Sequence, residues 1–445
     1  MAYKFTYIDL FAGIGGFHAA LDGMGGKCVA AVEIDKAAAA IYEANWGIPA
    51  LGDVTELAND DGVSIPKHDV LVAGFPCQPF SKSGAQRGME ETRGTLYWNI
   101  LRIIEEHKPA MVLLENVRNL VGPRHTHEWG VIIDTLRAEG YRVSSEPAIF
   151  SPHLLPPELG GRPQVRERVF IAATYVGEKA QASELETTPV VTHTPKNGWN
   201  TSNWRLKKHL PLQAARKLPG TALSEDEIHW IDAWNDFVEN MWELRNGVKL
   251  PGFPIWADAW VHTSDLKIPE DAPSWKVDFL TKNSLFYTDH KSFLDKWTKE
   301  WGVYTVKFPP SRRKLEWQAQ DTPRLWDTVM HFRPSGIRAK KPTYLPALVA
   351  ITQTSIIGPM RRRLSTREAA RLQGLPDWFD FGSQRDALTY KQLGNGVNVG
   401  VVWYVLKQQA ARDADLLKRH APRLLRAIRT APESPDAVLL TQQID

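Results

Sequence analysis

The chain of 445 residues is poor in cysteine, since Cys28 and Cys77 are the only two. Two distant cysteines provide neither a disulfide framework nor the spacing of a zinc site, so we expect no bound metal. The longest apolar runs, such as residues 111–114 and 399–402, are too short to cross a bilayer, and the first residues leave no room for a signal peptide. The sequence therefore predicts a cytoplasmic protein without a membrane partner, in which a lone thiol stays reduced.

The chain also lacks a strong excess of either charge, because the net charge is only +3. The distribution is uneven: residues 1–120 hold 10 Lys+Arg against 15 Asp+Glu, and the remainder holds 44 against 36. A basic second part fits a polyanionic partner, but a solvated surface with chance clustering explains the same numbers. Charge alone leaves both interpretations open.

The first third of the sequence alternates short apolar runs with helical patterns. Runs without polar alternation are typical of strands buried on both faces of a parallel sheet, and four occur here: residues 5–10, 28–32, 70–73 and 111–114. Helical patterns lie between and after them, at residues 17–24, 36–45 and 96–107. This order predicts a doubly wound α/β domain.

The strand–helix alternation stops after about residue 176 and a helical pattern resumes near residue 364, which divides the chain into four segments. We expect a catalytic and cofactor-binding domain at 1–180, a smaller irregular domain at 181–360, a return segment at 361–430 and a flexible tail at 431–445. The second segment carries twelve of the seventeen tryptophans together with several basic clusters. Aromatics with cations suit nucleic-acid contact, although at this density we expect about four in five of the tryptophans to be core.

A glycine-rich turn ends the first predicted strand, in Asp9-Leu10-Phe11-Ala12-Gly13-Ile14-Gly15-Gly16. Such a turn lets a ligand approach the backbone and a helix N-terminus, but many are merely tight links. Glu33, twenty residues after Gly13 at the end of the second strand, stands where an acid binds ribose hydroxyls. Asp53 either meets an adenine amino group or caps the next helix. Together these residues predict a nucleoside cofactor.

Cys77 follows the fourth predicted strand in the loop Phe75-Pro76-Cys77-Gln78-Pro79. Ligands of open parallel sheets bind at the carboxyl ends of the strands, so Cys77 is placed at the mouth of the cofactor crevice. Cys28 lies in an apolar run and is interpreted as an inert core residue. Cys77 becomes a nucleophile where cations or backbone amides lower its pKa.

Two further groups belong to the same predicted edge. Glu115 ends a buried strand, where desolvation tends to raise the pKa of a carboxyl and suits a proton donor; a satisfied strand-end carboxylate is the alternative. Arg166 and Arg168, two apart in a predicted strand, should point to one face and clamp a phosphate or a base carbonyl.

In this order the segments resemble the motif series of the DNA (cytosine-5) methyltransferases. The matching motifs are 11–16 (FAGIGG), Glu33, 74–78 (GFPCQ), 115–117 (ENV), 164–168 (QVRER), 367–373 (REAARLQ) and 394–397 (GNGV). The likeness covers about residues 5–176 and 360–406, and residues 93–96 resemble the stretch behind the family's mobile loop. Several linked motifs in order make the resemblance specific.

The resemblance implies an enzyme that transfers a methyl group from S-adenosylmethionine to carbon 5 of a flipped-out cytosine in double-stranded DNA. It implies that Cys77 adds to carbon 6, Glu115 acts at ring N3, and Arg166 and Arg168 hold the base and its phosphate. The loop of residues 80–93 would close over the base. The implied cofactor-binding residues are Phe11, Ala12, Gly13, Gly15, Gly16, Glu33, Ile34, Asp53, Pro76, Leu96, Asn395 and Val397.

The chain departs from the family pattern at residues 151–163, where a short turn is replaced by a longer, proline-rich segment that could add DNA contacts. Residues 176–359 correspond to the variable target-recognition region, whose basic clusters should contact phosphates. An RNA cytosine methyltransferase, a catalytically silent DNA-binding relative and a nicotinamide oxidoreductase are the alternatives. We expect a monomer in a bacterial restriction–modification system; the sequence does not tell which cytosine is methylated.

Overall fold

The structure, a computed structural model that describes residues 3–76, 95–214, 218–348 and 354–441, divides into two compact units. Unit 1 comprises residues 1–211, 346–350 and 366–445, and unit 2 comprises residues 212–345 and 351–365. The chain therefore leaves unit 1 after Pro211 and builds unit 2. It returns to unit 1 at residues 346–350 and again from Thr366.

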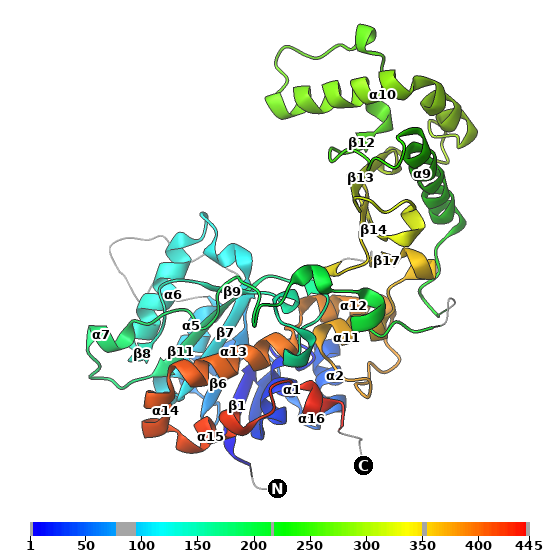
Figure 1. Cartoon of the computed structure of the whole chain (residues 1–445). Coiled ribbons are helices and arrows are strands. Elements are labelled where there is room, and N and C mark those ends of the chain that lie inside the picture. Colours follow the sequence, from blue (N-terminus) through cyan, green and yellow to red (C-terminus); the bar gives the residue numbers. More distant parts are fainter. Residues whose placement is uncertain (1–2, 77–94, 215–217, 349–353, 442–445) are drawn as a thin grey trace. The chain divides into compact units, whose positions relative to one another are not determined.

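A mixed sheet forms the centre of unit 1 (Figure 1). Its strands in spatial order are β3 (Ala50–Leu51), β2 (Gly26–Val32), β1 (Phe5–Leu10), β6 (Val70–Gly74), β7 (Met111–Val117), β11 (Arg168–Tyr175) and β8 (Tyr141–Arg142), and β9 (Ala148–Phe150) also pairs with β11. The pairs from β3 to β7 are parallel and those of β11 are antiparallel. The strand order reverses between β1 and β6, which is where open α/β sheets form a crevice.

Helices cover both faces of this sheet, so unit 1 is the doubly wound α/β domain that the sequence predicts. Helices α5 (Leu96–His107) and α6 (Thr126–Ala138) pack their apolar side chains on one face in a single core. Helix α1 (Gly16–Gly23) contacts α13 (Val399–Arg412), and α2 (Lys36–Trp46) begins at Asp35, whose carboxylate accepts hydrogen bonds from two backbone amides of the first turn. Such side-chain caps satisfy the unpaired donors of a helix start.

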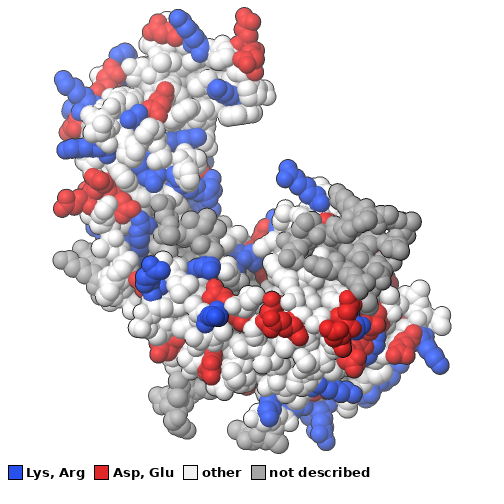
Figure 2. Space-filling model, turned by 180° about the vertical axis from the view of Figure 1, so that it is seen from behind, with Lys and Arg blue, Asp and Glu red and all other residues white. Residues whose placement is uncertain are grey.

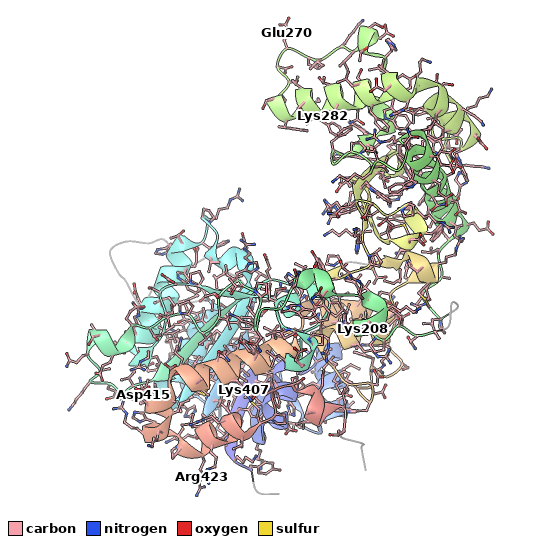
Figure 3. All side chains as sticks on the ribbon, in the orientation of Figure 1. Lys208, Glu270, Lys282, Lys407, Asp415 and Arg423 are labelled. Carbon is pink, nitrogen blue, oxygen red and sulfur yellow. The ribbon has the colours of Figure 1, made fainter. Side chains whose placement is uncertain are left out.

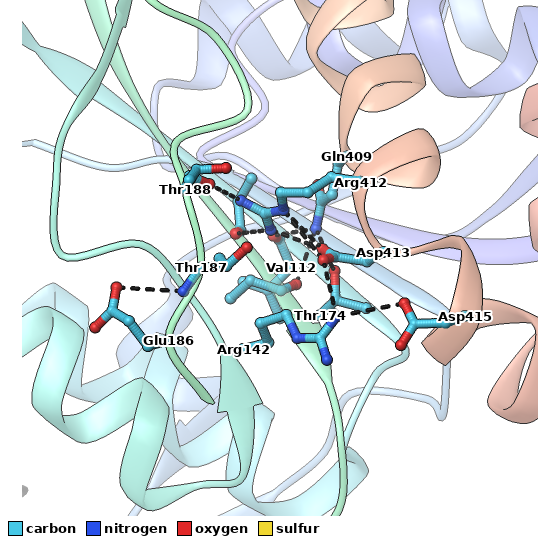
Figure 4. A network of polar contacts seen from close by, with 12 residues as sticks. Val112, Arg142, Thr174, Glu186, Thr187, Thr188, Gln409, Arg412, Asp413 and Asp415 are labelled. Carbon is cyan, nitrogen blue, oxygen red and sulfur yellow. Dashed lines mark hydrogen bonds and ion pairs between the residues drawn. The ribbon is translucent and has the colours of Figure 1, made fainter. Parts of the chain in front are cut away.

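The return segment completes unit 1 with α11 (Thr366–Gln373), α12 (Asp386–Asn395), α13, α14 (Ala414–His420), α15 (Pro422–Thr430) and α16 (Asp436–Leu439). Figure 4 shows how the end of α13 is fastened to β11. Arg412 donates to the carbonyl of Ala172, and the buried Asp413 accepts a 2.6 Å hydrogen bond from Thr174. Gln409 donates to the carbonyl of Ala173 at 2.9 Å. Segments more than 200 residues apart are thus one folding unit.

Two segments differ from the sequence expectation. Within the expected flexible tail, Asp436 pairs with Arg162 at 2.5 Å, and Leu439 is buried. The proline-rich segment of residues 151–163 is also packed in unit 1: it forms two short 3₁₀ turns, and a side chain at Gly160 would collide with Pro435 and Gly400. The segment contacts the return segment, and its DNA contacts stay a prediction.

Unit 2 is built on a second sheet and two long helices. The strand order is β12 (Ile255–Trp256), β13 (Lys314–Gln318), β15 (Gly336–Lys340), β14 (Val329–Arg333), β17 (Ile356–Ile357) and β18 (Arg362–Arg363). Helix α9 (Glu225–Leu244) starts with a capping box of Ser224 and Glu227, and α10 (Ser274–Glu300) contains a kink at His290. One face of the sheet and both helices share an aromatic core that includes Trp234 and Trp297.

The tryptophans of residues 177–360 are less buried than predicted: six are buried, five are half-buried and Trp275 is exposed. Figure 2 shows Lys and Arg side chains interspersed with Asp and Glu on the face that it presents. In the described ranges, no helix combines the length and the hydrophobicity needed to cross a bilayer.

Candidate active site

A pocket of about 380 Å³ opens at the carboxyl ends of β1, β2, β6 and β7, where the strand order places the crevice. Six stretches of unit 1 that are separate in sequence form its wall. The lining residues are Phe11, Ala12, Gly13, Gly16, Phe17, Glu33, Asp35, Ala38, Gly74, Phe75, Pro76, Glu115, Asn116, Val117, Arg168, Lys391, Gln392, Gly394, Asn395, Gly396 and Val397.

The glycine turn after β1 leaves room for a ligand against its backbone. Gly13 has a φ of 56°, and a Cβ built on it would meet no atom within 4 Å. At Gly16 a Cβ would lie 2.7 Å from a methyl carbon of Val397, so this glycine lets the return segment close the pocket. Gly15 serves packing instead, because its Cβ would collide with the indole of Trp46.

Glu33 stands in the pocket wall with its carboxylate fixed by the backbone. One oxygen accepts a 2.8 Å hydrogen bond from the amide of Gly13, and the other accepts a 2.7 Å hydrogen bond from the amide of Asp35. A carboxylate has about four acceptor positions, so two remain for hydroxyl donors of a ligand. The backbone therefore orients Glu33 for the ribose-binding role predicted from its spacing.

Three other predicted cofactor residues are not part of the described wall. Asp53 caps α3 (Val54–Leu57) through a 2.9 Å hydrogen bond from the amide of Thr55, which is the alternative that the sequence left open. Ile34 lies between the wall residues Glu33 and Asp35 with 67% of its surface exposed. Leu96 begins α5. Their contacts with a cofactor stay predictions.

Glu115 lies opposite Gly74 in the pairing of β6 with β7, and only 7% of its surface is exposed. Its carboxylate forms a 2.7 Å ion pair with Nε of Arg168, the first residue of β11. Burial raises the pKa of the Glu115 carboxyl, even though Arg168 and Arg166 both act to lower it. A buried carboxyl with a raised pKa, held by a guanidinium at the pocket wall, is suited to share a proton with a ligand.

Arg166 has a different place from Arg168. The expectation that both lie in one strand is wrong, because β10 (Gln164–Val165) ends before Arg166 and β11 begins at Arg168. The buried Arg166 donates hydrogen bonds to the carbonyls of Gly394 and Gly396, at 2.8 and 2.6 Å. Burial lowers the pKa of its guanidinium to about 9, which leaves it charged at neutral pH. Arg166 thus fastens the return segment behind the pocket.

Asn116 connects the end of β7 with the segment that leads to Cys77. Its side-chain amide donates a 2.8 Å hydrogen bond to the carbonyl of Phe75, and Phe75 and Pro76 both line the pocket. Cys77 itself and the predicted closing loop of residues 80–93 lie outside the described residues. Cys28 is buried, and burial raises the pKa of its thiol to about 12, as expected for an inert core cysteine.

Sequence reasoning missed several wall residues. Lys391 on α12 pairs with Asp35 at 3.3 Å and joins two distant stretches of the wall. Asn116 stood within a quoted motif, but no role was derived for it. Lys391 carried no local signal, because only the fold brings residues 35 and 391 together.

The profile of the C-5 cytosine-specific DNA methylases matches residues 5–410 of this chain. The chain belongs to this family. It is accordingly a DNA cytosine-5 methyltransferase. The nicotinamide alternative is excluded by this membership.

The type II methyltransferase M.AluI of Cellulosimicrobium cellulans is 51% identical over 511 aligned residues, which cover 98% of both chains. M.HpaII of Haemophilus parainfluenzae is 45% identical over 174 residues, or 39% of this chain and 46% of the relative. Among solved structures, the S. pombe Dnmt2 methyltransferase is similar with a TM-score of 0.47 and 17% identity, over 94% of this chain and 99% of that one.

Proposed function

We propose that this enzyme transfers the methyl group of S-adenosylmethionine to carbon 5 of a flipped-out cytosine in a specific duplex sequence, through a covalent bond between Cys77 and carbon 6. The observation that supports this best is one pocket wall in which Glu33, the buried Glu115–Arg168 pair and Pro76 occur together. Such a wall offers groups for a nucleoside and for a proton, and Pro76 precedes Cys77 in the sequence.

The residues of the pocket fit S-adenosylmethionine. The open space over Gly13 admits a ligand against the backbone, and the fixed carboxylate of Glu33 can accept two ribose hydroxyls. Asn395 and Val397 also line the pocket. When bound, S-adenosylmethionine supplies an electrophilic methyl group at its sulfonium.

The chain's own residues make cytosine reactive. The thiolate of Cys77 forms a bond to carbon 6, while Glu115 gives a proton to ring N3 and so balances the electron pair that enters the ring. Arg168 keeps the carboxyl in position. After carbon 5 is methylated, a base removes the carbon 5 proton, the bond between Cys77 and carbon 6 breaks and restores the thiolate, and N3 returns its proton to Glu115. The base must leave the helix for these contacts, at a cost of about a few kcal/mol.

Unit 2 is the proposed reader of the target sequence. The alignment with M.AluI covers both units, whereas a match to 39% of the chain, as for M.HpaII, cannot span them. We infer that the recognition sequence is shared with M.AluI and that methylation protects host DNA in a type II restriction–modification system. Bisulfite sequencing of DNA from cells that express either enzyme tests this; different methylated positions would contradict it.

The covalent step is tested with DNA that contains 5-fluorocytosine at the target, because fluorine cannot leave as a proton and the adduct is trapped. We expect a protein–DNA adduct with the wild type and with Cys28→Ala, the matched control on the chain's other cysteine. Cys77→Ser should form no adduct and should transfer no label from S-adenosylmethionine, while DNA binding persists. Label transfer by Cys77→Ser at the wild-type rate would refute the assignment, and preferential methylation of RNA would favour the RNA alternative.

A further inference from the structure

The polar face of the β13–β15–β14 sheet in unit 2 carries a group of positive charges that the enzyme's own fold does not neutralise. Side chains alternate between the two faces of each strand. The apolar side chains Leu315, Trp317, Ile337, Ala339 and Phe332 enter the core of unit 2. The opposite positions are mostly polar: besides Gly336 and the buried Val329, they are Lys314, Glu316, Gln318, His331, Arg333, Arg338 and Lys340.

Strand register places these polar residues in adjacent rows. Arg338 lies opposite Glu316 on one neighbouring strand and His331 on the other. Gly336 lies opposite Arg333, and Lys340 lies opposite Gln318. Directly opposed side chains on neighbouring strands are about 4.5–5.5 Å apart at Cβ. The three cations of β14 and β15 therefore share one small surface.

Among the residues that the structure describes, one carboxylate pairs with these cations. Glu316 pairs with Nε and Nη2 of Arg338, at 2.6 and 2.5 Å. In the described part of the chain, the side chains of Arg333 and Lys340 form no ion pair, although both are half-buried. Burial and Arg338 lower the pKa of both groups, as expected where like charges crowd. The fold thus keeps a repulsion that costs stability.

The exposed surface of α10 carries both paired and unpaired cations. Lys282 (Figure 3) pairs with Asp278 at 2.7 Å one turn away, and Lys291 pairs with Asp295. Lys276, Lys296 and Lys299 of the same helix are exposed and form no ion pair among the described residues, so the cations of the sheet face differ in being half-buried beside one another rather than in being unpaired. A charge arrangement that violates a local rule without compensation inside the protein is typical of a binding site.

We propose that this polar face is the surface with which unit 2 reads its DNA: Arg333 and Lys340 contact backbone phosphates, and Arg338, oriented by Glu316, reads a base edge. The inference rests on the proposed function, in which duplex DNA is the substrate. Sheets as well as two-stranded ribbons read DNA with their strands, and β14 and β15, two inner strands of this sheet, are joined by an exposed turn at Pro334 and Ser335. An arginine held by a carboxylate presents its remaining N–H groups in a defined direction.

Salt dependence tests the phosphate contacts. Dissociation constants of the full-length enzyme for a duplex are measured over a range of salt concentrations, for Arg333→Ala, Lys340→Ala and the matched control Lys282→Ala. Each face variant should reduce the slope of log K against log salt by about 0.9 and weaken binding equally for target and non-target duplexes. The control should keep the wild-type slope. Because each face variant removes a repulsion, its melting temperature should not fall below that of the wild type.

Specificity tests the base contact. Arg338→Ala should reduce the discrimination between target and single-mismatch duplexes by about 5- to 150-fold. Glu316→Gln should also reduce discrimination, but it should strengthen binding to non-target DNA because a negative charge is lost from the face. Unchanged slopes and unchanged discrimination in an enzyme that methylates DNA normally would overturn this inference alone. Failure of the wild type to methylate any cytosine would instead contradict the proposed function.

Discussion

The side-chain amide of Asn116 donates a 2.8 Å hydrogen bond to the carbonyl of Phe75, two residues before Cys77. Asn116 is buried at the end of β7 and also accepts a 2.8 Å hydrogen bond from the amide of Val117. A rigid strand thus holds the start of the segment that carries the proposed nucleophile. This contact makes Asn116 a positioning residue rather than a group that touches the substrate.

Replacing Asn116 with alanine should lower kcat by about 100-fold, because small displacements of a reacting group are costly in rate. The orphaned carbonyl of Phe75 should reduce the free energy of unfolding by about 1–3 kcal/mol. Affinity for S-adenosylmethionine should change little. Single-turnover methylation and equilibrium binding separate these effects, with the exposed Asn119→Ala as the control. A loss of cofactor affinity as large as the loss of rate would contradict a positioning role.

Replacing Glu115 with glutamine should lower the rate of methylation by about 10²- to 10⁴-fold, since a glutamine cannot give up the proton that N3 requires. The raised pKa of the carboxyl predicts that the wild-type rate falls as the pH rises above that pKa, whereas the residual rate of the variant should not depend on this group. Rates over a pH series measure both. Glu128→Gln, at another buried carboxyl of unit 1, is the matched control; a comparable loss there would point to a structural effect.

Substitutions of Arg166 and Arg168 should have different effects on stability and on methylation. Arg166→Ala removes two hydrogen bonds to the carbonyls of Gly394 and Gly396, so the free energy of unfolding should fall by about 2–4 kcal/mol and cofactor affinity should fall with it. Arg168→Ala leaves Glu115 without its ion pair and should mainly reduce methylation. Urea unfolding and cofactor titration distinguish the variants. If Arg168→Ala destabilised the protein more than Arg166→Ala, these assignments would be reversed.

The burial of Asp9 leads us to expect that the stability of the protein depends on pH. It is fully buried on β1, and burial raises the pKa of its carboxyl well above the ordinary value, with a further contribution from Glu33. The folded state therefore keeps a proton that the unfolded chain loses above about pH 4. The contribution of Asp9 to the free energy of unfolding should fall as the pH rises from there toward the native pKa.

Asp9→Asn should remove this contribution, because the amide resembles the protonated carboxyl. Urea unfolding at about pH 5 and about pH 8 measures the difference, with the exposed Asp61→Asn as a control that should keep the wild-type pH dependence. Identical pH dependence in the wild type and in Asp9→Asn would show that Asp9 is ionised in the folded protein.

Much of unit 1 was predictable because its signals are local. The expected strand of residues 5–10 and the expected helix of residues 96–107 agree with β1 and α5, and the family resemblance is confirmed. Apolar runs without alternation can only be buried on both faces, which implies a parallel sheet covered by helices. Because ligands of such sheets bind at the carboxyl ends of the strands, the parallel sheet also indicates where the cofactor residues meet.

The separate roles of Arg166 and Arg168 could not be predicted, because a break between β10 and β11 depends on partners more than 200 residues away. The packing of the tail could not be predicted for the same reason. Pro435 and Asp436 lie in a segment that resembles a flexible terminus in sequence, but Pro435 packs against Gly160 and Asp436 forms an ion pair with Arg162.

The sequence by itself determined the residue types, their order and the reaction class, since each motif carries chemistry that depends on local spacing. Only the tertiary structure decided which residues share one wall, such as Asp35 with Lys391, and which face of unit 2 keeps unpaired cations. The physical reason is that burial and pairing depend on contacts between distant segments, which no local pattern records.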